Sequence, residues 1–224
     1  QRPVRELIQK RLEIDRELEE MRTEVTILFA EMRGLSRVFE ELGDLEGRAV
    51  IQQLHDQINE IISSRTGRLL KTLGDEIMAT FPDPICGVYA AIDIQKKLEQ
   101  TDLQGLRKAP IELRIGLHHG LGLVEESDLH GDVVSTAARI QNLAEPGQIL
   151  LSEGVHRHLH REEKIYILFQ GVRPIPGKKE PVELYRVIWK PEEMQRDVFR
   201  SATARQEAFW LELARQDDLI RITT

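Results

Sequence analysis

Apolar side chains recur every seven positions through the first 25 residues of the chain, within an otherwise charged segment. The two seams of this repeat are Val4, Leu18 and Val25 (interrupted by Arg11) and Leu7, Ile14 and Met21. A heptad pattern with charged flanks predicts a helix that pairs with a second copy in a parallel coiled coil. The repeat is shorter than three or four clean heptads, so a single amphipathic helix packed on its own domain is the alternative.

Beyond this helix, short apolar runs alternate with amphipathic stretches, which predicts a sheet covered by helices. The predicted strands are 25–30, the two arms of a hairpin within 71–81, 111–118, 121–124, 149–151, 165–169 and 182–189. The predicted helices start at Ser36 and cover 45–63, 87–98, 133–143 and, capped by Ser152, 152–160. From Pro191 onward the pattern is helical again, and we expect a separate C-terminal extension over 191–224.

Length, net charge and cysteine content limit the kinds of protein this chain can be. The chain of 224 residues has room for one substantial core, and its net charge of −7 argues against a general nucleic-acid binder. A single cysteine, Cys86, indicates a reducing compartment, and no apolar run is long enough to span a membrane. We expect a cytoplasmic domain of a longer protein, with a sensor or a membrane anchor elsewhere in that protein.

Two acidic residues follow predicted strands and suggest a metal site. Glu31 ends the strand 25–30 and precedes Gly34, and Asp75 lies in the Gly-Asp turn of the hairpin. Hard cations prefer oxygen ligands, and a pair of them can clamp the attacking and leaving oxygens of a phosphoryl displacement. Taken singly, Glu31 is equally well explained as a solvated acid and Asp75 as part of a common tight turn.

A third segment, residues 128–140, completes an ordered set of motifs. The set consists of Val25-Thr26-Ile27-Leu28-Phe29-Ala30-Glu31-Met32-Arg33-Gly34, then Lys71 with Gly74-Asp75, then Arg114-Ile115-Gly116-Leu117-His118, and then Asp128, Gly131 and Ala137-Ala138-Arg139. In this order the motifs resemble the catalytic domain of class III nucleotidyl cyclases, over roughly residues 22 to 189. The resemblance implies an α+β fold with a ferredoxin-like (βαββαβ) core, whose helices cover a central, mostly antiparallel sheet. It also implies three parts: a coiled-coil signalling helix (1–22), the catalytic domain (23–190) and the helical extension.

The resemblance further implies an adenylate cyclase that acts as a homodimer, with each copy giving a different half of the active site. One half would bind two Mg²⁺ or Mn²⁺ ions through Glu31, Asp75 and the Met32 carbonyl, and would bind phosphate through the backbone amides of Arg33, Gly34, Leu35 and Ser36. The other half would present Lys71 and Asp128 to adenine, Arg139 to the α-phosphate, Ser135 to the ribose and Lys178 to phosphate. A solvated loop is the alternative interpretation of Lys178.

Two residues depart from the family pattern. Glu31 stands where the family usually has Asp, and Ser135 stands where it usually has Asn. A shift of one methylene at the first position and a shorter hydrogen-bonding side chain at the second both affect positioning, to which catalysis is sensitive. A catalytically degenerate module that binds nucleotide or dimerises is therefore the alternative function. Guanylate cyclase activity is a lesser alternative, because the Lys71–Asp128 pair suits adenine.

Overall fold

The computed structural model describes residues 7, 8, 10–12, 16, 22–100, 111–124, 129–159, 165–190, 192 and 193. The elements in chain order are β1 (Arg22–Arg33), α2 (Leu35–Ser64), β2 (Arg68–Leu73), β3 (Glu76–Phe81), α3 (Pro84–Gln100), β4 (Glu112–Val124), β5 (Leu129–His130), α4 (Asp132–Leu143), β6 (Ile149–Ser152), α5 (Glu153–His156), a 3₁₀ turn η1 (Arg157–Leu159), β7 (Tyr166–Arg173) and β8 (Val182–Ile188).

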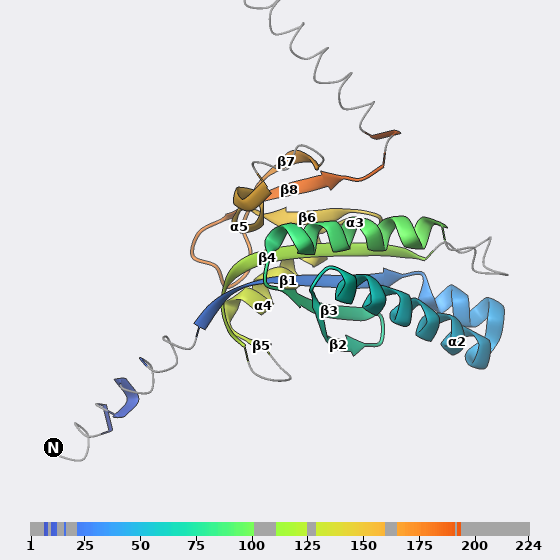
Figure 1. Cartoon of the computed structure of the whole chain (residues 1–224), viewed down its shortest axis with the longest axis horizontal. Helices are drawn as coiled ribbons and strands as arrows, with labels where there is room; N and C mark the ends of the chain where they lie inside the picture. The colour runs from blue at the N-terminus through green and yellow to red at the C-terminus, as the bar shows by residue number, and fades with distance from the viewer. Residues whose placement is uncertain are drawn as a thin grey trace, which may run out of the picture. The chain divides into compact units, whose positions relative to one another are not determined.

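These strands form one sheet with the order β2-β3-β1-β4-β6-β8-β7, and β5 pairs with β4 (Figure 1). The first six elements from β1 to β4 follow the βαββαβ sequence, and their strand order β2-β3-β1-β4 is that of a ferredoxin-like core. The pairs that β1 makes with β3 and β4 are antiparallel, whereas β4 and β6 run parallel. The predicted α+β fold with a mostly antiparallel sheet is therefore confirmed.

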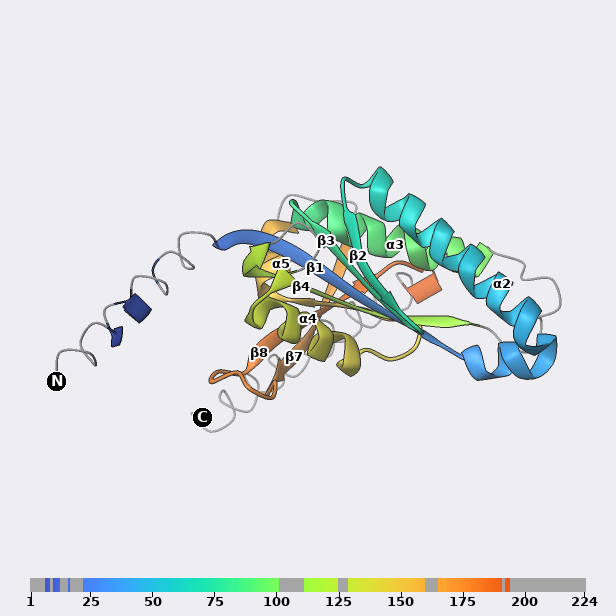
Figure 2. The same cartoon turned by 90° about the horizontal axis from the view of Figure 1, so that it is seen from below.

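Helices cover both faces of the sheet. Figure 2 shows α2 and α3 on one side of the strands and α4 on the other. On the α3 side, the Leu117 side chain of β4 packs against Gly87 of α3, where an added Cβ would lie 3.2 Å from it. On the α4 side, Gly116 of β4 lies directly beneath the backbone of Gln141. Strand residues of opposite parity therefore face different helices.

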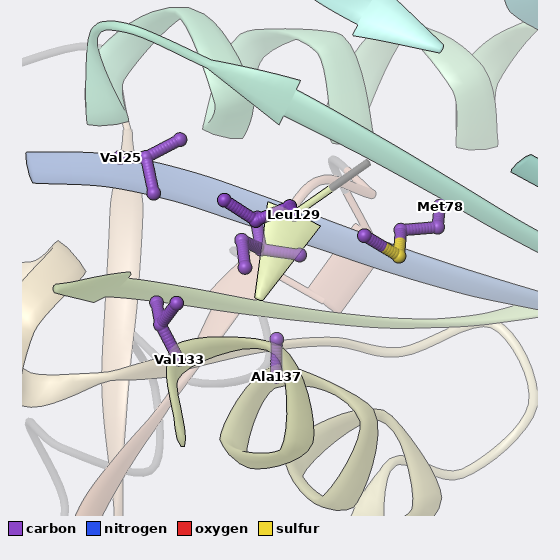
Figure 3. Close-up of a cluster of buried hydrophobic side chains, with 6 residues drawn as sticks. Val25, Met78, Leu129, Val133 and Ala137 are labelled. Atoms are coloured by element: carbon purple, nitrogen blue, oxygen red, sulfur yellow. The ribbon is translucent and has the colours of Figure 1, made fainter. Parts of the chain in front are cut away.

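Alternation along β1 places one set of its side chains beneath α4. Val25 and Ile27 are buried in a cluster with Met78 of β3 and with Val133 and Ala137 of α4. Figure 3 shows Val133 and Ala137 pointing from α4 toward the strands that carry Val25 and Met78. Because successive strand residues alternate between faces, the same set continues through Phe29 to Glu31. The apolar face that anchors α4 thus ends in an acid.

Several predicted boundaries need correction. β1 begins at Arg22, so the helix predicted to reach residue 25 ends earlier, and Val25 is a core residue of the strand. The predicted return strand 121–124 is wrong, because β4 is continuous to Val124 and β5 makes the return. The lack of a side chain at Gly122 lets α4 pack closely over this part of β4, because an added Cβ would lie only 2.9 Å from Val133.

Other local predictions are confirmed or refined. The two helical stretches predicted after β1 form α2, and they are separated at Gly43, whose φ of 76° is left-handed. The hairpin around Gly74-Asp75 is confirmed as β2 and β3. Ser152 precedes α5 but makes no side-chain cap; its Oγ lies 2.8 Å from Nδ1 of His118 instead.

The chain divides into two compact units, Gln1–Val187 and Ile188–Thr224. In the first unit, the described residues of the predicted coiled coil are helical, and Leu7, Ile8 and Leu12 are exposed. Pairing of this helix with a second copy stays a prediction. In the second unit, the Lys190 ammonium lies 4.7 Å from the centre of the Trp189 ring, and the predicted helix from 191 onward falls almost entirely outside the described residues. No helix in the described ranges has the length and apolarity needed to cross a bilayer.

Candidate active site

Glu31 is a buried acid of the predicted site, and its residue exposure is 7%. Arg33 donates from Nη1 to Oε1 (2.8 Å), and Gln141 of α4 donates from Nε2 to Oε2 (2.8 Å). Arg114 of β4 forms an ion pair with the same Oε2 through Nη2. Burial alone raises the pKa of Glu31, but the hydrogen bonds from Arg33, Arg114 and Gln141 outweigh it, so the pKa lies below its ordinary value of 4.5. Glu31 is therefore an anion at neutral pH.

Register and close packing explain why these groups meet. Glu31 lies directly opposite Arg114 in the β1–β4 ladder, and cross-strand partners project from the same face. Gln141 reaches this point because α4 rests on Gly116, where a Cβ would lie 2.2 Å from the Gln141 nitrogen. Neither Arg114 nor Gln141 was predicted as a site residue. The parity of β1 would have suggested which face Glu31 occupies, but not its partners.

Asp75 lies beside the end of β1. Its backbone carbonyl accepts a hydrogen bond from the Met32 amide (2.8 Å), and Gly74 before it adopts a φ of 64° that suits the tight turn. Within the described part of the chain, the Asp75 carboxylate makes no hydrogen bond or ion pair. The structure therefore brings Glu31, Met32 and Asp75 together at adjacent strand ends, while the Met32 side chain itself is buried.

This oxygen-rich corner fits a divalent cation in its chemistry. Two carboxylates and a nearby main-chain carbonyl are the donors that Mg²⁺ and Mn²⁺ prefer. Oε1 of Glu31 has one contact, the exposed Arg33, which a cation can replace. No group of three His, Cys, Asp or Glu side chains suited to a metal occurs among the described residues, and carbonyl, water or substrate oxygens are suitable further ligands.

The segment Arg33 to Ser36 leads from β1 into α2. Gly34 precedes the helix with a φ of 96°, and its carbonyl accepts a hydrogen bond from the Arg37 amide (3.1 Å). The first turn contains no acidic residue, and no side chain caps it. The free N–H groups of such a helix start favour an anion, in agreement with the predicted phosphate contact.

A second group of predicted residues gathers around α4. Ser135 donates from Oγ to the Asp132 carbonyl (3.0 Å), and Arg139 lies two turns from Asp132 on the same helix. Lys178, from the β7–β8 loop, forms an ion pair with the Asp132 carboxylate. The Arg139 guanidinium lies against Gly177, where a Cβ would be 3.0 Å from Nη1. The hydrogen bond from Lys178 is the largest influence on the pKa of Asp132 and lowers it.

Lys71 is exposed on β2 at the edge of the sheet. It lies opposite Met78, which belongs to the cluster under α4, so Lys71 is on the α4 face. Asp128, its predicted partner at the base, lies outside the described residues. The described residues of the second half therefore stretch across one sheet face, from β2 at one edge to the β7–β8 loop at the other.

Comparison with known proteins identifies the family. Residues 18–188 match the model of the "Adenylate and Guanylate cyclase catalytic domain". The chain belongs to this cyclase family. An "Adenylate cyclase" of Anabaena cylindrica is 31% identical over 73% of this chain, and the "Receptor-type guanylate cyclase gcy-8" of Caenorhabditis elegans is 28% identical over 70% of it. The chain spans only 36% and 15% of the length of these two relatives.

Solved cyclase structures share the fold. The crystal structure of the adenylyl cyclase CyaB from P. aeruginosa superposes with a TM-score of 0.66, at 23% identity, over 75% of this chain and 94% of that one. The predicted resemblance to class III cyclases is thus confirmed. Cyclase domains of this family bind nucleotide, act as dimers and generally use divalent metal ions. The roles of individual residues in this cyclase domain remain predictions.

Proposed function

We propose that this cyclase domain is an adenylate cyclase, a phosphorus–oxygen lyase that converts ATP to 3′,5′-cyclic AMP and pyrophosphate between two copies of the chain. The observation that carries the proposal is the juxtaposition of Glu31 and Asp75 at adjacent strand ends, next to the uncapped start of α2. Carboxylates beside free N–H groups suit a triphosphate whose charge is shared with cations.

In the proposed reaction the ribose 3′-hydroxyl loses its proton to solvent and its oxygen attacks the α-phosphorus, and pyrophosphate leaves as the bond from the α-phosphorus to the bridging oxygen breaks. Glu31, Asp75 and the Met32 carbonyl hold the cation site. Two Mg²⁺ or Mn²⁺ ions bound there would lower the pKa of the attacking hydroxyl and neutralise the triphosphate. The amides from Arg33 to Ser36 donate to phosphate oxygens.

The second half acts on the base, the ribose and the α-phosphate. Lys71 donates to the adenine edge, and Asp128 accepts from its exocyclic amine. Arg139 donates to the α-phosphate as negative charge develops there. Ser135 gives up its hydrogen bond to the Asp132 carbonyl and donates to the ribose instead, which orients the sugar. Lys178 breaks its ion pair with the Asp132 carboxylate and binds phosphate.

Two features support assembly from two copies through the α4 face. Glu31 of the first proposed half lies on this face beneath α4, and Lys71 and Arg139 of the second half lie on the same face and on α4. A twofold axis would place the first half of one copy opposite the second half of its mate. Leu73, whose cross-strand partner is Glu76 beside Glu31, is 75% exposed in the single chain. Burial of such a side chain in a dimer is favourable. In the longer protein, the helix before residue 22 would transmit the signal of an upstream sensor by changing how the two copies face each other.

Activity and complementation test this proposal. Purified protein with ATP and Mn²⁺ should form cyclic AMP, and turnover of none of four nucleoside triphosphates with either metal would reject it. Asp75→Ala and Arg139→Ala should each be inactive alone, yet their mixture should recover about a quarter of wild-type activity, because half of the dimers are mixed and each contains one intact site. A mixture of Asp75→Ala with Glu31→Gln is the matched control and should stay inactive, since both changes affect the same half.

A regulatory module that binds nucleotide without turnover is the second candidate. It is favoured by the Glu31 carboxylate, which already has two guanidinium partners, Arg33 and Arg114. Calorimetry with a non-cyclisable ATP analogue distinguishes the candidates when read beside the activity assay. Binding with no product would favour the regulatory module.

A further inference from the structure

The two oxygens of the Glu31 carboxylate are held in different ways. Oε2 is bound by Arg114 from β4 and by Gln141 from α4, and both of these elements belong to the core of the fold. Oε1 is bound by Arg33 alone. Arg33 is the last residue of β1, and its side chain is 53% exposed, compared with 18% for Arg114.

The donors on Oε2 are costly to remove. The Nε of Arg114 is buried and has no acceptor among the residues that the structure describes. Withdrawal of Arg114 from Glu31 would leave further buried donors of the same guanidinium unpaired, and unpaired buried donors are strongly unfavourable. Gln141 is 2% exposed, and the close approach of α4 to Gly116 fixes its backbone. Oε2 therefore keeps its partners.

The donor on Oε1 is easily removed. The Arg33 guanidinium is half exposed and is readily hydrated when it leaves, whereas the Glu31 side chain is only 9% exposed and depends on its remaining protein donors. Arg33 can swing into solvent, and the anion it leaves is still oriented by Arg114 and Gln141. Only Oε1 then becomes open to a new cation.

We propose that Arg33 and a divalent cation compete for Oε1 of Glu31, while Arg114 and Gln141 act as positioning residues that keep Oε2 in place. The inference rests on the proposed function in taking Glu31 as a metal ligand. The new element is that the cation binds only Oε1 of Glu31. Competition from Arg33 then raises the metal concentration at which this site is half occupied. Without metal, the Arg33 guanidinium occupies Oε1 and balances the negative charge of the buried Glu31.

Binding of Mn²⁺ to the nucleotide-free chain tests the competition directly, through the loss of the free-ion signal in electron paramagnetic resonance. Arg33→Gln should lower the Kd for Mn²⁺ by about threefold to fivefold, as expected when the half-exposed Arg33 guanidinium no longer competes for Oε1. Arg33→Lys keeps the charge and should stay closer to wild type. Arg65→Gln is the matched control, because Arg65 forms a half-exposed ion pair with Asp93 on another part of the domain and its loss changes the net charge equally.

A Glu31→Gln background completes the test. There the substitution of Arg33 should no longer change Mn²⁺ affinity, since the shared ligand is gone. The proposal is overturned if Arg33→Gln binds Mn²⁺ no more tightly than wild type, or if Arg65→Gln tightens binding to the same extent. Thermal melts confirm folding, and Arg33→Gln should melt within about 4 °C of wild type.

The outcome is separable from that of the proposed function. If Arg33→Gln tightens Mn²⁺ binding but no cyclic nucleotide forms, the competition stands and the cyclase activity is rejected. If cyclic AMP forms but Mn²⁺ binding is unchanged in Arg33→Gln, the activity stands and the competition is rejected.

Discussion

Gly116 is the point at which α4 rests on the sheet, and Gly116→Ala is the sharpest test of the architecture. An added Cβ would lie 2.2 Å from the backbone nitrogen and 2.6 Å from the Cα of Gln141. Ordinary contacts begin near 3.4 Å, so α4 must move by about 1 Å. The atoms in the way belong to the main chain of a helix, and rotation of a side chain cannot relieve the overlap.

The cost has two parts. Overpacking of a core typically costs about 1–3 kcal/mol, while replacing glycine by alanine recovers about 0.4–1 kcal/mol by reducing the freedom of the unfolded chain. We expect a net loss of about 1–2 kcal/mol, which corresponds to about 2–8 °C in Tm for a domain of this size. Because α4 carries Arg139 and Gln141, a 1 Å displacement should also reduce cyclase activity by about a hundredfold.

Thermal unfolding followed by circular dichroism, together with the cyclase assay, measures both effects. Gly120→Ala is the matched control on the same strand and the same face. Its added Cβ would meet the His118 side chain at 3.5 Å and Val133 at 3.7 Å, which are normal distances. Equal melting temperatures for the two variants would refute the packing of α4 on Gly116.

Three further predictions concern individual charged or titratable side chains. Glu31→Asp restores the usual family residue but should destabilise the domain by about 1–3 kcal/mol, because the shorter side chain leaves the donors of Arg114 and Gln141 unpaired. Urea unfolding measures this loss, and unchanged stability would contradict the contacts of Glu31. Burial, reinforced by Lys178, lowers the pKa of His118 from 6.5 to about 4. Between these two pH values His118 is protonated in the unfolded chain but neutral in the native protein. Stability should therefore fall by about 3 kcal/mol as the pH drops from 6.5 toward 4, and a pH profile of His118→Gln should lack this fall. Lys71→Glu should shift product formation from ATP toward GTP in parallel assays, and an unchanged ratio would remove Lys71 from the base site.

Local patterns in the sequence determined much of this protein. The Gly74-Asp75 turn, the two helical stretches on either side of Gly43 and the apolar face of α4 follow from residues that are neighbours in the chain. Turn chemistry and periodicity act over a few residues, so they can be predicted without a structure. The ordered motifs identified the family on the same basis, and with it the ferredoxin-like core.

Only the tertiary structure decided how Glu31 is held. Arg114 is 83 positions away and Gln141 is 110 positions away, and both reach Glu31 through strand register and through the contact of α4 with Gly116. Continuity of β4 past Gly120 depends likewise on long-range packing, since α4 and β5 cover a stretch that looks like a turn in the sequence. Such pairings gain their free energy from contacts between distant segments, which no local pattern encodes. The sequence therefore predicted which acids form the candidate metal site, and the fold determined which oxygen of Glu31 is bound by Arg114 and Gln141.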